Sequence, residues 1–189
     1  MQNFRLQGTK FSFPGSSLLV VNTYFPCDPR VNNFDDTEIV SLLSDIHNLM
    51  RDSDSTNILV AGDLNSHFSR NSRFSNLIKE FFEEQLNFKI FFETPSDKII
   101  PVDYTHMFMS ENITSFSTID HFIGNQNVFG SVTEAGVTHY AENFSNHSPI
   151  YVKLDVGQLS LSMEKAINQK RTRWNKASEE ARHQRSLQE

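Results

Sequence analysis

The sequence predicts an α+β fold, and three observations lead to that prediction. Short apolar runs that are partly β-branched, such as residues 18–24, are typical of buried strands. Residues 39–50 repeat their apolar side chains at helical spacing. Residues 149–156 alternate apolar and polar side chains, as a strand with one buried face does. Strands mixed with helices favour packed layers, and 189 residues suffice for one domain with a real core.

The first strand is predicted over residues 18–24 and ends before Pro26, because proline lacks the amide hydrogen that a ladder needs. A loop follows. Three of the residues 35–38 are acidic and predict a helix start, with an acid three residues after a capping acid. The helix continues with an apolar stripe that predicts core packing rather than a binding face: Ile39, Leu42, Leu43, Ile46, Leu49 and Met50.

A second strand is expected over residues 57–61, and it runs directly into Gly62, which allows the backbone to turn sharply. The next helix is expected from about Phe74 to Gln85, with four apolar residues facing inward: Leu77, Ile78, Phe81 and Phe82. Residues 93–103 are predicted to form a loop. The remaining strands are predicted over residues 117–123, 132–140 and 149–156.

Charge is distributed unevenly along the chain. The formal net charge is -6, of which residues 1–162 carry -9 and residues 163–189 carry +3. The segment after Gly157 is polar, basic and favours helix, with too few apolar residues for a core of its own. Residues 1–157 are therefore predicted to form one domain, and residues 158–189 a basic helical tail or linker. An acidic domain lacks the basic surface that is typical of general nucleic-acid binding, but it is compatible with a cation site.

Cys27 is the single cysteine, so no internal disulfide is possible. The first residues contain no long apolar segment of the kind that secretory signals have, and no stretch approaches membrane-spanning length. These features predict an intracellular protein, nuclear or cytoplasmic, that is not secreted and has no membrane partner.

Asp63 and Asn65 lie two residues apart where a buried strand is predicted to end. A strand end holds side chains rigidly while the following loop exposes them. An aspartate there can deprotonate water, and an asparagine amide can donate to a phosphate oxygen as charge builds up. The alternative is purely structural, because Gly-Asp-Leu-Asn is also rich in turn formers and would suit an Asx-type turn.

Asp120 lies in an otherwise apolar strand and needs a hydrogen-bond donor, because an unpaired buried carboxylate is costly. It is either a structural carboxylate or the group that orients the imidazole of His147. Tyr24 ends the first strand, where its phenol can contact phosphate or be merely half-buried. His67 and His106 flank loops where a substrate phosphate would lie.

Four segments in this order, residues 22–26, 62–65, 117–120 and 145–149, resemble the endonuclease/exonuclease/phosphatase superfamily over roughly residues 15–156. The resemblance implies part of a four-layer αββα sandwich and Mg²⁺- or Mn²⁺-dependent phosphodiester hydrolysis. It implies that Asp63 activates the attacking water and that Asn65 stabilises the pentacovalent phosphorus. It also implies that Asp120 orients His147, which contacts the scissile phosphate, and that Tyr24 contacts phosphate.

Two details resemble the endonuclease domains of non-LTR retrotransposons, which implies DNA as the ancestral substrate. Residues 65–67 are similar to the extended turn motif of that branch, and residues 173–177 to the linker that follows it. Two features depart from the family. Asn146 stands where the family has an aspartate, which leaves only a weak metal ligand because an amide carries no charge. The part that supplies another asparagine and a metal-binding glutamate has no counterpart, which predicts an N-terminal truncation.

The sequence thus predicts a retroelement-derived, metal-dependent DNA endonuclease domain fragment with impaired activity. Two alternatives stay open: a non-catalytic domesticated binding module, and a small-molecule phosphatase or phosphodiesterase of the same superfamily. A truncated sandwich would expose unpaired strand edges and an apolar face. We therefore expect low stability, self-association or a protein partner at that face.

Overall fold

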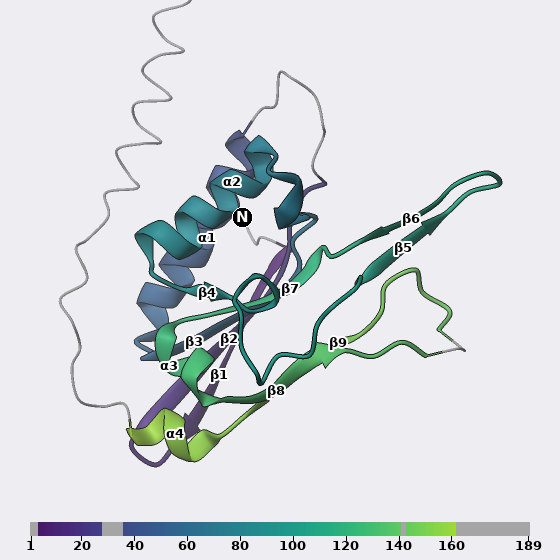
Figure 1. The fold of residues 1–189 in the computed structure, drawn as a ribbon. Coiled ribbons are helices and arrows are strands. Elements are labelled where there is room, and N and C mark those ends of the chain that lie inside the picture. The colour runs from purple at the N-terminus through teal and green to yellow at the C-terminus, as the bar shows by residue number, and fades with distance from the viewer. Residues whose placement is uncertain (1–3, 28–35, 141–142, 162–189) are drawn as a thin grey trace, which may run out of the picture.

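The computed structural model describes residues 4–27, 36–140 and 143–161, and a five-stranded sheet lies at its centre (Figure 1). The strands follow the order β1 (Leu6–Phe13), β2 (Ser16–Tyr24), β3 (Asn57–Asp63), β7 (Asp120–Gly124) and β4 (Lys89–Ile90). Strands β2 and β3 are parallel, and the other neighbours are antiparallel. The α+β prediction is confirmed.

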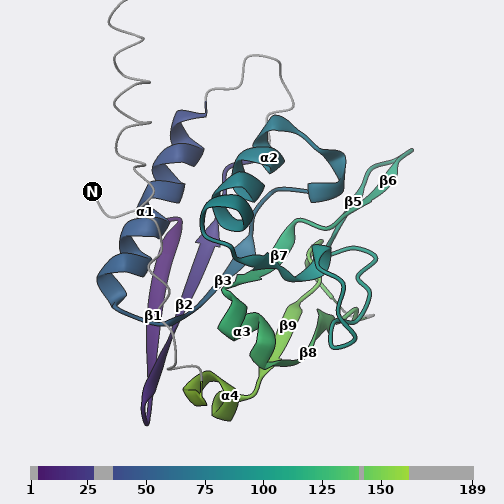
Figure 2. The same cartoon turned by 60° about the vertical axis from the view of Figure 1, so that its left-hand side comes forward.

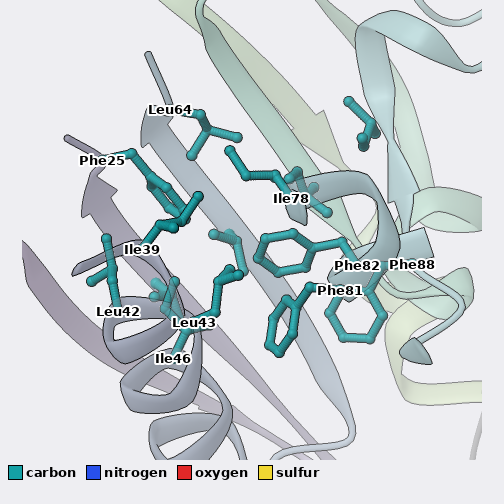
Figure 3. Close-up of a cluster of buried hydrophobic side chains, with 14 of the residues drawn as sticks. Phe25, Ile39, Leu42, Leu43, Ile46, Leu64, Ile78, Phe81, Phe82 and Phe88 are labelled. Carbon is teal, nitrogen blue, oxygen red and sulfur yellow. The ribbon is translucent and has the colours of Figure 1, made fainter. Parts of the chain in front are cut away.

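One face of this sheet is covered by helices (Figures 1 and 2). They are α1 (Thr37–Ser53), α2 (Arg73–Lys79) and a π-helical continuation of α2, η2 (Glu80–Gln85). The predicted stripe of α1 is buried here except for Leu49, which is partly buried, and Figure 3 shows Leu43 and Ile46 near Phe81 and Phe82. The predicted second helix is therefore present, although its second half widens into the π form.

Helix α1 begins where the acidic segment predicts a helix start, but the predicted capping acid, Asp35, lies outside the described residues. Asp36 is the N-cap residue, but its side chain makes no capping hydrogen bond. Its backbone has φ -78° and ψ 0°, which is not the extended conformation that directs a cap side chain back to the helix. The Asp36 carboxylate instead accepts a hydrogen bond from Arg73 at 2.8 Å, which links the start of α1 to the start of α2.

The other face of the sheet is covered by a second, two-stranded sheet and two short helices (Figure 2). Strands β8 (Val132–Val137) and β9 (Ile150–Leu154) pair antiparallel, and α3 (Gln126–Ser131) and α4 (Val156–Leu161) pack beside them. Two apolar clusters result, one on each face, because successive residues of a strand point to opposite sides. Leu159, which the sequence places in the tail, is buried in the second cluster, whereas residues 162–189 lie outside the described part.

A hairpin of β5 (His106–Met109) and β6 (Thr114–Ser117) extends away from the two sheets (Figures 1 and 2). Two single turns complete the fold, η1 (Phe68–Arg70) and η3 (Phe91–Glu93). The sequence does not predict β1, β4, β5 or β6, because their side chains are mostly exposed or the strand is very short. The strand expected over residues 117–123 is present as β7, which begins three residues later than expected, at Asp120.

No helix among the described residues is both long and apolar enough to cross a membrane. The most exposed strand of the central sheet is the edge strand β1, where Phe11 is about half exposed. Association of this surface with a second copy or another protein stays a prediction.

His121 on β7 gives the fold a specific pH dependence. Its ring is fully buried, and Nε2 donates to the carbonyl oxygens of Ser66 and Thr118 at 2.9 and 3.1 Å. Burial lowers the pKa of His121 from 6.5 to about 4, against smaller opposing effects of those two carbonyls. Between these two pKa values the histidine is protonated in the unfolded chain but not in the folded chain. The free energy of unfolding therefore decreases as pH falls from about 6.5 to about 4.

We expect this loss to reach about 3 kcal/mol of unfolding free energy at the acidic end of the window. Urea unfolding between pH 7.5 and pH 4 measures it. The His121→Gln variant removes the titrating group and should have a flatter pH dependence over the same range. Equal slopes for the variant and the wild type would show that another group is responsible.

Candidate active site

Three polar side chains lie in one row across the central sheet. The register pairs Tyr24 on β2 with Asp63 on β3, and Asp63 with Asp120 on β7. Directly opposite residues of neighbouring strands project from the same face, so these side chains share one side of the sheet. Residues far apart in the sequence are thereby placed together by strand pairing alone.

The turn after β3 fixes the position of Asp63. Its Oδ1 accepts a hydrogen bond from the backbone amide of Asn65 at 2.8 Å, while Asn65 itself adopts a left-handed conformation with φ 48°. The Asn65 side chain donates to the carbonyl oxygen of Phe25 at 2.9 Å. An Asx-type turn is therefore present, and it holds the carboxylate at the strand end.

The surroundings of Asp63 favour its protonated form. Burial raises the pKa of the Asp63 carboxyl, and the neighbouring Asp120 carboxylate raises it further. The hydrogen bond from the Asn65 amide and the proximity of His147 act in the opposite direction. A carboxylate with a raised pKa is a stronger base than one in open water.

Asp120 and His147 form a direct pair. His147 Nδ1 lies 3.0 and 3.2 Å from the two carboxylate oxygens of Asp120, and the side chains are only 34% and 14% exposed. With Nδ1 donating to Asp120, the other ring nitrogen of His147, Nε2, is left for a ligand. The pair has the geometry in which a carboxylate fixes the orientation and tautomer of an imidazole.

Asp63, Asp120 and His147 each offer a ligand atom, and the three atoms lie within 4.8 Å of one another. Carboxylate oxygens suit hard cations such as Mg²⁺ and Mn²⁺. Asn146 is exposed, and its amide donates to Nε2 of His106 at 3.0 Å. The side chain of Asn146 is thus engaged by a neighbouring histidine and contributes no negative charge to the group.

The two other histidines that the sequence singles out have different surroundings. The His106 ring lies 4.6 Å from the ring of His147, and residues 106 and 147 form an antiparallel bridge. His67 Nδ1 accepts a hydrogen bond from the Thr118 amide at 3.1 Å, and Nε2 contacts Ser69. His106 is therefore part of the site, whereas His67 connects the turn after β3 to the segment before Asp120.

Arg5 is a residue near the site that sequence reasoning missed. Its guanidinium carbon lies 5.2 Å from the ring centroid of Tyr24, which is 48% exposed, and its Nε pairs with Glu38 at 3.2 Å. The carbonyl oxygen of Arg5 also accepts a hydrogen bond from the Tyr24 amide. Only the antiparallel pairing of β1 with β2 brings the two side chains together, so no local sequence motif indicates it.

No family model and no curated protein matches the sequence. Solved structures do match its fold. An endonuclease/exonuclease/phosphatase family protein from Leptotrichia buccalis aligns over 78% of this chain and 53% of its own, at 13% identity and a TM-score of 0.53. The endonuclease domain of TRAS1, a telomere-specific non-LTR retrotransposon, aligns over 80% and 70%, at 14% identity and a TM-score of 0.59.

A third match is the 3′ phosphatase NExo from Neisseria, solved with a product DNA hairpin, over 80% of this chain and 65% of its own, at 14% identity and a TM-score of 0.59. The chain thus spans little more than half the length of the first of these structures. At such identities the likeness concerns the fold alone, and that fold is the one found in endonuclease/exonuclease/phosphatase proteins.

Proposed function

We propose that this chain is a metal-dependent DNA endonuclease domain of retroelement origin, with a weakened cation site and slow turnover. The observation that carries the proposal is the grouping of Asp63, Asp120 and His147 within 4.8 Å. The fold shared with the TRAS1 endonuclease domain and with a DNA-bound 3′ phosphatase supports phosphate-ester hydrolysis on DNA.

Asp63 is the base of the proposed reaction. It accepts the proton of the attacking water, and the hydrogen bond from the Asn65 amide holds its carboxylate in place at the strand end. Asp120 holds the Nδ1 proton of His147 and stabilises the ring when it is charged. The Nε2–H of His147 then donates to an oxygen of the scissile phosphate, whose negative charge grows as the water oxygen bonds to phosphorus. The bond from phosphorus to the leaving sugar oxygen breaks, and that oxygen takes up a proton from solvent.

Two further side chains contact the phosphate in this proposal. The exposed Tyr24 hydroxyl donates to a non-bridging oxygen, and Arg5 supplies a nearby positive charge. Asn65 already donates one amide hydrogen to Phe25, which leaves a second hydrogen for the phosphate. The same bond that positions Asn65 therefore does not prevent it from stabilising the pentacovalent phosphorus.

The donor set fits Mg²⁺ or Mn²⁺, because proteins hold such ions with one or two carboxylates, water and substrate phosphate. Asp63 and Asp120 would hold the ion, with Asn146 as a weak neutral ligand. When bound, the ion would neutralise charge on the phosphate.

A second candidate is a DNA-binding module without catalysis, which the amide at Asn146 favours. Plasmid nicking, fluorescence anisotropy with a DNA hairpin, and hydrolysis of bis(p-nitrophenyl) phosphate separate the candidates. The proposal predicts nicking that requires Mn²⁺ and stops in EDTA. Binding without nicking would identify the module, and hydrolysis of only the small ester would identify a small-molecule phosphodiesterase.

Replacing the amide with a carboxylate should strengthen the cation site. In Asn146→Asp we expect Mn²⁺ to bind about tenfold more tightly, since one added charge near a surface-bound ion contributes roughly 1–2 kcal/mol. Calorimetric titration with Mn²⁺ measures the change. Asp97→Asn, which removes an exposed carboxylate on the loop between η3 and β5, is the control and should leave the affinity unchanged. Unchanged affinity in Asn146→Asp would place the ion away from residue 146.

A further inference from the structure

Thr105 joins the two segments that carry Asp120 and His147. It is fully buried and directly precedes β5. Its hydroxyl oxygen accepts hydrogen bonds from the backbone amides of Ile119 and Asp120, both at 3.0 Å. Its carbonyl oxygen accepts from the amide of Ser148 at 2.7 Å. One residue thus binds the backbone of Asp120 and the backbone next to His147.

The surrounding contacts show that this link spans a whole segment. The Thr105 amide donates to Ser117, and the Met107 amide donates to Asn146 at 2.8 Å. Residues 105–107 therefore lie between residues 117–120 on one side and residues 146–148 on the other. The distance between Asp120 and His147 is set through this segment, because the backbones that carry both side chains are hydrogen-bonded to it.

We propose that Thr105 is a positioning residue that holds the Asp120 carboxylate against the His147 ring. The proposal deepens the function above and rests on it for the catalytic consequence, but the positioning itself does not depend on activity. Without the hydroxyl, the half-buried amides of Ile119 and Asp120 would lose this acceptor. The backbone would then move to find other partners, and the carboxylate would move with it.

Thr105→Val tests this directly, because valine has nearly the same shape but no hydroxyl. We expect kcat for plasmid nicking to fall roughly 10- to 100-fold with KM nearly unchanged, since small displacements of reacting groups have effects of that size. Thr105→Ser keeps the hydroxyl and should restore most of the rate. Rescue by serine distinguishes a positioning hydroxyl from a residue that only fills space.

Thr23→Val is the matched control. Thr23 is also buried, at 2% exposure, but its hydroxyl has no hydrogen-bond partner among the described residues. The same substitution there removes no interaction and should leave the rate unchanged. A similar loss in both variants would attribute the effect of Thr105→Val to packing rather than to its hydrogen bonds.

Two NMR readouts decide the proposal even if the wild type cleaves nothing. In Thr105→Val, the Ile119 and Asp120 amides should exchange with solvent at least tenfold faster. The Nδ1 proton of His147, bonded to Asp120, should lose its downfield resonance, while Thr105→Ser should retain both signatures. Unchanged exchange and an unchanged resonance in a folded Thr105→Val protein would overturn the proposal. If the wild type shows slow amide exchange and the downfield resonance but does not nick DNA, only the proposed function is contradicted.

Discussion

The Asp63→Asn variant should lose about 10³-fold in the rate of metal-dependent DNA nicking, because removing a general base has effects of that order. Asparagine keeps an oxygen that can accept the Asn65 amide hydrogen, so the turn after β3 is expected to persist. Only the basic oxygen and the negative charge are removed. Initial rates of supercoiled plasmid conversion under saturating Mn²⁺ measure the change.

The same variant should not be less stable than the wild type. Burial raises the pKa of Asp63, so folding disfavours the charged carboxylate, and a neutral amide avoids that cost at neutral pH. Asp97→Asn is the activity control, since it makes the same substitution at an exposed position away from the site. A large loss of both activity and stability in Asp63→Asn would indicate that the carboxylate has mainly a structural role.

The Gly62→Ala variant should be destabilised by at least about 3 kcal/mol, enough to unfold much of a marginally stable domain. Gly62 has φ 140°, a backbone conformation that residues with a side chain rarely adopt. An added Cβ would also lie 2.0 Å from the carbonyl oxygen of Thr23 on the adjacent strand. Since Gly62 pairs with Thr23 in the register, the strands would have to separate beside Asp63.

Gly130→Ala is the matched control for this effect. Gly130 lies in α3, and an added Cβ there would meet no atom within 4 Å, so alanine fits at this position. Alanine also favours helix over glycine, so this variant should be unchanged or slightly more stable. Urea unfolding followed by circular dichroism compares the two variants. Equal unfolding midpoints would show that an alanine at position 62 does not clash with the adjacent strand.

Strong apolar periodicity explains why much of the fold is predictable. The stripe of α1, the strand over residues 57–61 and the alternation of β9 each reveal a buried face in the sequence itself. Strand β1 and the β5–β6 hairpin escaped prediction because their side chains are largely exposed, which leaves no apolar pattern. Periodicity reports burial, so an exposed strand has no such signal.

The candidate site also contains residues that the sequence indicates and residues that it does not. The individual polar residues Asp63, Asp120 and His147 are conspicuous beside apolar runs, and their order along the chain suggests their roles. Thr105 and Arg5 have no such signal, because their importance depends on strand pairing and on hydrogen bonds to backbone atoms. Contacts of this kind are made by the fold and are not encoded in any short stretch of sequence.

The most direct test of the account is the nicking of supercoiled plasmid by the 189-residue chain in Mn²⁺ and in EDTA. The account predicts slow conversion to open circles that needs the metal, is lost in Asp63→Asn and His147→Ala, and persists in Asp97→Asn. Absence of Mn²⁺-dependent conversion by a folded wild-type chain, or equal conversion by all four proteins, would contradict it.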